Sequence, residues 1–201
     1  MFNEQIVYVV DDDPAVRDSL GLLLKSAGIN TVTYESAERF LDDFDPQCRG
    51  CLLVDVRMPG MSGLELQRAL AQQDSQLYVL VMTGHGDVPM AVQAMKAGAT
   101  EFIVKPFDDE MLLNRLNECL RHSADELETE RTRQQRQDRL AALTAREREV
   151  LDLLVEGKPN KVVAAELNIS PRTVEVHRAR IMDKLEVGSL AELVRVALNP
   201  N

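Results

Sequence analysis

The sequence predicts two domains of different class: a doubly wound α/β domain with a five-stranded parallel sheet in residues 1–121, and an all-α domain in residues 141–201. In the first segment, short apolar runs alternate five times with helical patterns. Strands separated by helices form parallel sheets with helices on both faces. The last segment contains helical patterns only, and a total of 201 residues suits two domains.

Each element of the first domain has its own signal. Strands are expected at five apolar runs, near 6–10, 30–34, 51–55, 78–82 and 101–104. Helices are expected after each of them, near 14–27, 36–44, 63–73, 88–97 and 108–121. Asp13 followed by Pro14 has the pattern of an N-cap and a first helical residue. Gly28 and Gly98 have the pattern of C-terminal helix ends.

Residues 122–140 are expected to link the two domains. The stretch 128–139 has no apolar residue, so it suits either a disordered tether or a polar helix stabilised by pairs such as Glu130 and Arg133. Residues 107–156 contain neither glycine nor proline. Because no helix breaker interrupts this stretch, we predict one long helical linker.

The all-α domain contains four helical patterns. They are expected over 144–156, from Asn160, from Pro171 to about Leu185 and from Ser189. Thr144 with Glu147, and Ser189 with Glu192, have the spacing of capping boxes. The short turn 168–170 joins the second and third helices. This is the geometry of a helix-turn-helix, whose later helix enters the major groove of DNA.

Charge is distributed unevenly along the chain. Residues 1–121 hold 19 acidic and 10 basic side chains, whereas residues 141–201 hold nine of each. The net charge of −10 therefore belongs mainly to the first domain and does not exclude nucleic acid as a ligand of the second. No run of about 18 apolar residues and no signal-peptide pattern are present, so we expect no membrane span and a cytoplasmic location.

The chain has three cysteines, Cys48, Cys51 and Cys119. An odd number in a cytoplasmic chain argues against a disulfide framework. The C-x-x-C formed by Cys48 and Cys51 suits either a redox or metal site or a pair of reduced packing thiols. Because Cys51 opens a predicted strand and no second Cys or His pair is present, we favour packing thiols.

Five polar side chains come directly after predicted strands: Asp11, Asp12, Asp55, Thr83 and Lys105. The carboxyl ends of parallel strands form the ligand crevice of an open sheet, so these side chains are expected to converge. Three carboxylates there suit a hard divalent cation, and they repel one another without it. A hydroxyl and an ammonium beside them suit a phosphoryl group. Asp55 ends the central strand and is the predicted phosphoryl acceptor; a simple turn-capping role would leave the other two acids unexplained.

This set of residues resembles the receiver domain of bacterial two-component response regulators, which has a flavodoxin-like fold. The resemblance implies phosphorylation of Asp55 by a sensor histidine kinase, with Mg²⁺ or Mn²⁺ as cofactor. The implied metal ligands are Asp11, Asp12, Asp55 and the backbone carbonyl of Arg57. Lys105 would pair with a phosphoryl oxygen as a point charge, and its peptide bond to Pro106 would be cis.

The same resemblance implies a conformational switch. Thr83 would move toward the phosphoryl group and Phe102 would turn inward, although Phe102 by its position alone suits ordinary core. Helix 88–97 and strand 101–104 would have two packings, of which phosphorylation favours one. The phosphorylated chain would form a homodimer through this face, with Val92 and Lys96 at its centre, because residues four apart share one face of a helix.

The last segment, with its runs LTAREREVLDLLVEG and RTVEVHRARIMDKL, resembles the LuxR-type DNA-binding domain, so the whole chain resembles the NarL/FixJ family of response regulators. This implies regulation of transcription, with double-stranded promoter DNA and RNA polymerase as partners. The residues expected to hold phosphates are Lys161, Thr173, Arg178 and Arg180, with Arg172 flanking. Those expected to meet base edges are Glu175, Val176 and Ala179. A neutral domain binds weakly as one copy, so dimerisation on a two-fold site is the expected source of affinity.

Among the residues expected to meet base edges, Glu175 is expected to accept a hydrogen bond from cytosine N4. Two other positions on this helix have alternative interpretations. His177 and Arg178 suit DNA contact and a structural role equally, the latter by packing or by pairing with Glu147 or Glu149.

Other classes of function fit less well. No G-x-x-x-x-G-K-[ST] motif is present, so an ATP-driven activator is not expected. A phosphohydrolase with an aspartyl nucleophile needs a second aspartate two residues after the first, where this chain has Arg57. A receiver-only interaction adaptor would not need the predicted recognition helix. We therefore expect a regulator and not an enzyme, apart from assisting its own phosphorylation and dephosphorylation.

Overall fold

A computed structural model describes residues 5–84 and 88–198 of the chain. The chain divides into two compact units, residues 1–126 and 127–201. Among the described helices, none is both long enough and apolar enough to cross a membrane. Each unit has its own hydrophobic core.

The first unit contains a five-stranded, entirely parallel sheet in the order β2-β1-β3-β4-β5. Its strands are β1 (Ile6–Val10), β2 (Thr31–Tyr34), β3 (Gly50–Asp55), β4 (Leu77–Thr83) and β5 (Glu101–Val104). Each described strand lies within one residue of its predicted bounds. The register places Val10 opposite Val54, and Asp55 opposite Met82, so the carboxyl ends of β1, β3 and β4 meet at one edge of the sheet.

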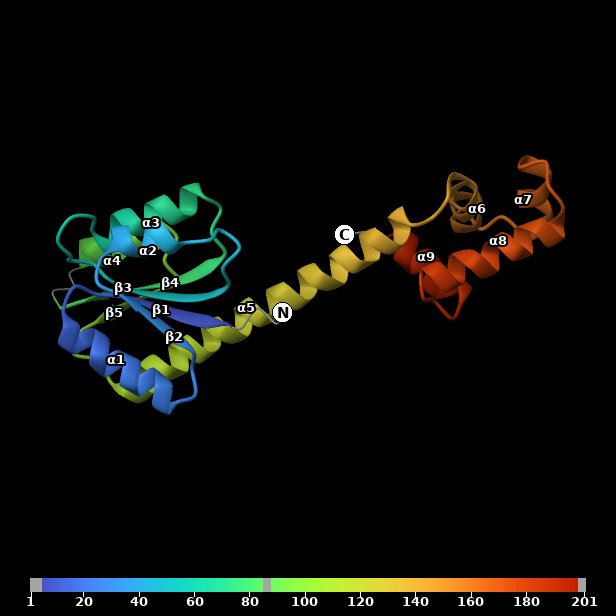
Figure 1. Ribbon diagram of the computed structural model, residues 1–201. Helices are drawn as coiled ribbons and strands as arrows, with labels where there is room; N and C mark the ends of the chain where they lie inside the picture. Colours follow the sequence, from blue (N-terminus) through green and yellow to red (C-terminus); the bar gives the residue numbers. More distant parts are fainter. Residues whose placement is uncertain (1–4, 85–87, 199–201) are drawn as a thin grey trace. The chain divides into compact units, whose positions relative to one another are not determined.

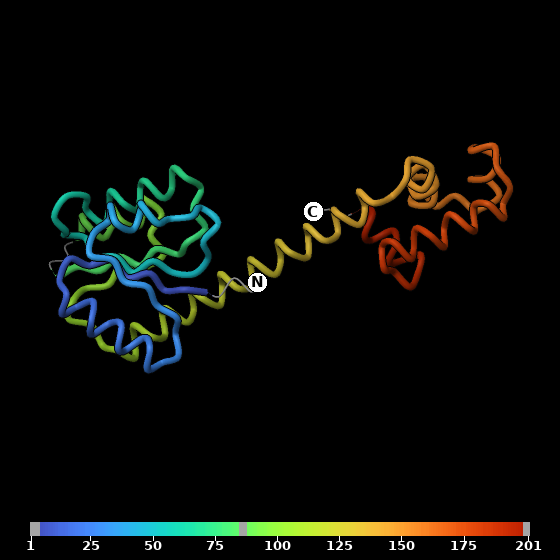
Figure 2. The backbone as a smooth tube through the Cα atoms, viewed as in Figure 1, coloured from blue at the N-terminus to red at the C-terminus, as the bar shows by residue number. Residues whose placement is uncertain are grey.

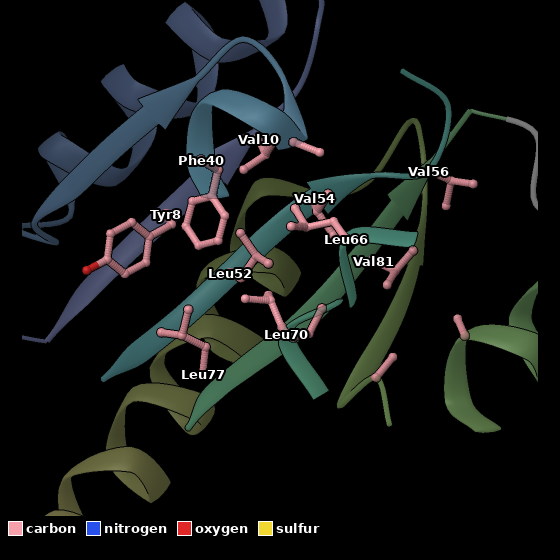
Figure 3. Close-up of a cluster of buried hydrophobic side chains, with 14 of the residues drawn as sticks. Tyr8, Val10, Phe40, Leu52, Val54, Val56, Leu66, Leu70, Leu77 and Val81 are labelled. Carbon is pink, nitrogen blue, oxygen red and sulfur yellow. The ribbon is translucent and has the colours of Figure 1, made fainter. Parts of the chain in front are cut away.

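Helices cover both faces of this sheet (Figure 1). The helices are α1 (Pro14–Ser26), α2 (Ala37–Asp43), α3 (Gly63–Gln72), α4 (Val88–Lys96) and α5 (Asp109–Ala141). α2, α3 and α4 lie on one face; Phe40, Leu66 and Leu70 pack there against strand residues such as Leu52 and Val54 (Figure 3). On the other face, α1 and the first part of α5 pack against the alternate strand residues. Burial on both faces explains why the central strands are apolar at nearly every position.

Local signals account for the helix ends. The Asp13 carboxylate accepts a hydrogen bond from the Ala15 backbone N–H, as predicted for an N-cap. Gly28 and Gly98 have φ angles of +75° and +93°, the left-handed conformation that favours glycine after a helix. Ser62 and Glu65 form a capping box at the start of α3.

α5 is a single helix of 33 residues, so the helical linker is confirmed. Leu112, Leu116 and Cys119 are buried against the sheet, and the Ser123 hydroxyl accepts a hydrogen bond from the Gly50 N–H at 3.1 Å. Beyond Ser123 the helix is largely exposed. A hydrogen bond from the Gln134 amide to Asp138, 2.8 Å long and four residues away, is of the kind that stabilises a polar helix.

The second unit is all-α and is followed from orange to red in Figure 2. After the end of α5 it contains α6 (Ala145–Val155), α7 (Asn160–Glu166), α8 (Pro171–Lys184) and α9 (Leu190–Leu198). Its core is formed by side chains from all four of these helices, including Val150, Leu154, Val163, Ile181 and Leu193. The two units therefore have the predicted fold classes.

The capping predictions in this unit are confirmed at Thr144, which forms a complete box with Glu147. They are confirmed in part at Ser189. The Ser189 hydroxyl accepts from the Glu192 N–H at 3.2 Å, but the Glu192 carboxylate accepts from Gly188, one residue earlier than predicted. The carboxylate of Glu192 therefore bonds an N–H four residues earlier in the chain, whereas in a standard capping box it bonds the N–H three residues earlier.

Candidate functional site

Four of the five predicted side chains gather where the strands end. Asp11 follows β1, Asp55 ends β3, Thr83 ends β4 and Lys105 follows β5. Asp11 and Thr83 are each 1% exposed and Asp55 is 7% exposed. The Lys105 backbone N–H donates to the Thr83 carbonyl at 2.7 Å, which extends the pairing of the last two strands into the site. The Lys105–Pro106 peptide bond is cis, as the resemblance implied.

The Lys105 ammonium lies between the two buried carboxylates. Its Nζ donates to Asp11 Oδ2 and to Asp55 Oδ1, each at 2.6 Å. Burial lowers the pKa of Lys105, but the hydrogen bonds and charges of both aspartates outweigh it, so the pKa is raised above its usual value. A buried charge is stable only when it is paired, and here one cation satisfies two anions.

This donor set fits a divalent cation. Carboxylate oxygens of Asp11 and Asp55 already converge on one positive charge, and hard cations prefer such oxygen ligands. Asp12, the third predicted acid, is exposed. Across residues 5–84 and 88–198, no three carboxylate, thiol or imidazole groups gather around one point as metal ligands do. The structure therefore brings together two of the three predicted carboxylates, with Lys105 as their counter-ion.

The loop after Asp55 is held at two points. The Arg57 N–H donates to Asp55 Oδ2 at 2.6 Å, which holds the start of the turn against the acid. Farther along, the Glu38 carboxylate accepts from the Met61 N–H at 2.7 Å. Gly60 lies between them with φ +75°, and a Cβ there would lie 2.5 Å from Glu38 Oε1. Sequence reasoning missed Glu38, because a surface acid on α2 carries no signal that it contacts a distant loop.

Arg17 also supports the site and was not predicted. Its guanidinium donates to the Asp11 backbone carbonyl at 2.7 Å, while Asp11 Oδ1 accepts from the Asp13 N–H at 3.0 Å. Both contacts fix the turn from β1 into α1. The helical position of Arg17, four residues after the N-cap, places it over this turn, and that spacing is the signal that identifies it.

The predicted switch residues lie on adjacent strands. Thr83 is buried, and Phe102 is partly buried and packs against the core on the α3–α4 side. Val92 and Lys96 are exposed on α4, as a surface role requires. We name the exposed apolar surface formed by Val88, Val92 and Met95 of α4 and Val104 of β5 the α4–β5 face.

In the second unit, α8 is the predicted recognition helix and is 14 residues long. Val174, Ile181 and Leu185 are buried, as expected for its inner face. The outer residues are exposed: Arg172, Glu175, Val176, Ala179 and Arg180. Ser170 caps the helix by accepting from the Thr173 N–H at 3.1 Å, and Lys161 is exposed on α7. The helical period therefore predicted correctly which of these side chains of α8 are buried and which are exposed.

Pairing of His177 or Arg178 with Glu147 or Glu149 was one form of the structural alternative, and both glutamates have other partners among the described residues. Glu147 pairs with Lys184 at 2.7 Å, and Glu149 pairs with Arg146 at 2.6 Å. His177 and Arg178 are both partly buried, and His177 Nδ1 is buried with no hydrogen-bond partner among the described residues. Lys184, at the end of α8, also donates to the Ala142 carbonyl at 3.1 Å, so its ammonium lies at the start of α6.

Comparison with known proteins identifies the family of each domain. Residues 7–117 match the response regulator receiver domain family, and residues 141–197 match the bacterial regulatory proteins of the luxR family. The chain is 51% identical over 192 residues to the transcriptional regulatory protein FixJ of Azorhizobium caulinodans, covering 96% of this chain and 91% of the relative. It is 41% identical to the response regulator protein TodT of Pseudomonas putida, covering 95% of this chain and 84% of the relative.

Two solved structures extend over nearly the whole chain. The response regulator StyR is 45% identical with a TM-score of 0.89, covering 97% of this chain and 98% of that one. Full-length FixJ from B. japonicum is 44% identical with a TM-score of 0.59, covering 98% of this chain and 97% of that one. The chain belongs to the FixJ-type response regulators of two-component systems, transcription factors that combine a receiver domain with a LuxR-type DNA-binding domain.

Proposed function

We propose that Asp55 accepts a phosphoryl group from a phosphohistidine of a sensor histidine kinase, and that this controls binding of promoter DNA in the cytoplasm. The supporting observation is the position of the Lys105 ammonium, 2.6 Å from both Asp55 and Asp11. Phosphoryl transfer depends on positioning and charge neutralisation, and both are provided here by groups from three strand ends.

The chain's own groups account for each part of the transfer. A carboxylate oxygen of Asp55 attacks phosphorus in line, and the bond from phosphorus to the kinase imidazole nitrogen breaks. The Lys105 ammonium moves from the Asp55 carboxylate to a phosphoryl oxygen and keeps its bond to Asp11. The Arg57 N–H holds the second Asp55 oxygen. Asp11, Asp12, Asp55 and the Arg57 carbonyl would hold Mg²⁺ or Mn²⁺, whose charge would neutralise that of the phosphoryl group.

We propose that phosphorylation acts through Thr83 and Phe102. Thr83 is buried at the end of β4, the strand that pairs with β3, and Phe102 is partly buried on β5, which pairs with β4. A change in the side-chain conformations of Thr83 and Phe102 would alter how α4 packs on the sheet. The α4–β5 face is then the surface for homodimerisation, since Val88 is 77% exposed and Val92 44% exposed.

The dimerisation step is tested by sedimentation velocity on the full chain with and without acetyl phosphate and Mg²⁺. We expect the mass to double on phosphorylation in the wild type and to stay that of a monomer in Val92→Glu, because a charge would be buried in the interface. A matched control is Val32→Glu, an exposed valine on β2 at the far edge of the sheet. A dimer that persists in Val92→Glu would place the interface elsewhere.

We propose that α8 enters the major groove of promoter DNA. Arg172, Thr173, Arg178 and Arg180, with Lys161 on α7, would hold phosphates, and Glu175, Val176 and Ala179 would meet base edges, with His177 beside them. A gel shift with promoter DNA tests the whole proposal: phosphorylation should increase the affinity, and the Asp55→Ala variant should show no response. RNA polymerase is the expected partner of the bound dimer.

A further inference from the structure

Gln67 is a buried amide at the contact between α3 and α4. Gln67 is 2% exposed, and its neighbours on α3 include the buried apolar residues Leu66 and Leu70. The Gln67 Nε2 group donates to the backbone carbonyl of Ala94 on α4 at 3.1 Å. This is a direct polar contact between α3 and the C-terminal end of the helix that presents the α4–β5 face.

The Ala94 carbonyl does not depend on that contact. It already accepts from the Ala97 N–H at 3.1 Å and from the Ala99 N–H at 3.0 Å. Gly98, with φ +93°, makes this pair of bonds possible, as in helices that end on a left-handed residue. A carbonyl has two lone pairs, so a third donor adds little.

The other end of the amide is unsatisfied. Gln67 Oε1 is buried, and no protein donor among the described residues reaches it. A buried acceptor without a partner carries its full desolvation cost, which is larger than the net gain from an ordinary hydrogen bond. Buried groups of this kind are few in native proteins. The side chain of Gln67 therefore opposes the arrangement in which it lies.

α4 is held loosely enough for this cost to matter. Ala94 is its one buried residue among those described, whereas Val92 is 44% and Met95 49% exposed. A shift of the C-terminal end of α4 away from α3 would admit water to Gln67 Oε1 and remove the cost. The unsatisfied oxygen of Gln67 therefore favours a shift of α4 away from α3.

We propose that Gln67 is a positioning residue of the switch, which destabilises the packing of α4 on α3 and so favours the rearranged form that dimerises. The inference rests on the proposed function. Gln67→Leu removes the unsatisfied oxygen, retains the volume and should stabilise the described arrangement. By linkage, the phosphoryl group that drives the rearrangement must then overcome a larger difference in free energy between the two forms.

The test uses the full chain with beryllofluoride and Mg²⁺ as a phosphoryl mimic, and sedimentation velocity to find the concentration at half-dimerisation. We expect this concentration to rise on the order of tenfold in Gln67→Leu, which is the size of shift that an unsatisfied buried group produces. Gln72→Leu, the same change at an exposed position at the end of α3, is the control and should leave it unchanged. Gln67→Met repeats the test with a more flexible side chain.

A second measurement separates the two proposals. The melting temperature of the unphosphorylated chain should rise in Gln67→Leu and Gln67→Met and stay constant in Gln72→Leu. A wild type that dimerises at the same concentration as both Gln67 variants would overturn the role of Gln67. A wild type that does not dimerise at all would overturn the proposed function, and the melting temperature would still decide whether Gln67 is a destabilising group.

Discussion

The acceptor site and the recognition helix are built in opposite ways. The acceptor site joins Asp11 and Lys105, which are 94 residues apart, and Asp55, which is 50 residues from Lys105, and its carboxylates are almost completely buried. The recognition helix draws its residues from 14 consecutive positions, and Arg172, Glu175 and Arg180 among them are exposed. The first site depends on the tertiary fold for its chemistry, whereas the second depends on the helical period.

The largest effect is expected at Asp55. Asp55→Ala should abolish phosphate incorporation from acetyl phosphate or a kinase, because it removes the carboxylate proposed to accept the phosphoryl group. Asp11→Ala should reduce incorporation strongly and Asp12→Ala less, since Asp11 is buried against Lys105 and Asp12 is exposed. Intact-mass measurement gives the extent of phosphate incorporation in each variant.

Asp18→Ala, an exposed acid on α1, is the matched control and should incorporate phosphate normally. Full incorporation in Asp55→Ala would contradict the assignment of the acceptor. Equal losses in Asp11→Ala and Asp12→Ala would show that burial does not distinguish the two acids.

A core substitution tests whether the two regions are energetically separate. Ile181 is fully buried in the core of the second unit, on the inner face of α8. Ile181→Ala should lower the free energy of unfolding of that unit by about 2–5 kcal/mol, through lost burial and the cavity left behind. Phosphate incorporation at Asp55 should be retained. Calorimetry should show one shifted transition and one unchanged; loss of incorporation would show that the units are coupled.

Substitutions on the exposed side of α8 should have smaller and distinct effects. Arg180→Ala should weaken binding to all DNA sequences and reduce the dependence on salt, because it removes a phosphate contact. Glu175→Ala should instead relax the preference at one base pair by roughly 1–3 kcal/mol. Selected-site sequencing and salt titrations measure both. An unchanged set of selected sites for Glu175→Ala would show that Glu175 does not read a base.

The smallest effect is expected from a buried pair that supports α8. The Lys184 ammonium and the Thr144 N–H hold the pKa of Glu147 at about 2, well below its usual value. A carboxyl whose pKa is depressed on folding contributes stability above its unfolded pKa of about 4.3 and loses it as the pH falls through about 2. The melting temperatures of wild type and Glu147→Gln should therefore converge as the pH falls from 5 to 2. A constant difference would show that packing, not charge, is the contribution of Glu147.

The elements that were predicted well are those with local signals. Each strand of the first unit and the helices α1 to α4 lie within one residue of the predicted bounds, because proline, glycine and capping residues mark their ends. The extent of α5 followed from the lack of a helix breaker. The Ser189 turn differed by one residue, because Gly188 and not Ser189 donates to Glu192. Local chemistry allows both arrangements.

The contacts that sequence reasoning missed are those between distant elements. Glu38 to Met61, Lys184 to Glu147 and Gln67 to Ala94 each join residues on different helices or loops. A surface acid, a helix-end lysine and a mid-helix glutamine all suit exposed positions when they are taken singly. Only packing shows which polar groups are removed from water and what they must then pair with.

The sequence by itself determined the order of elements, the two fold classes, the gathering of polar residues at strand ends and the outward face of α8, because period and capping are local properties of the chain. The tertiary structure decided which acids converge: Asp11 is buried at Lys105 while its neighbour Asp12 is exposed. Successive residues at a strand end point to opposite sides, and only the packed neighbours decide which side is the crevice. The same packing placed Gln67 where its oxygen has no protein donor among the described residues.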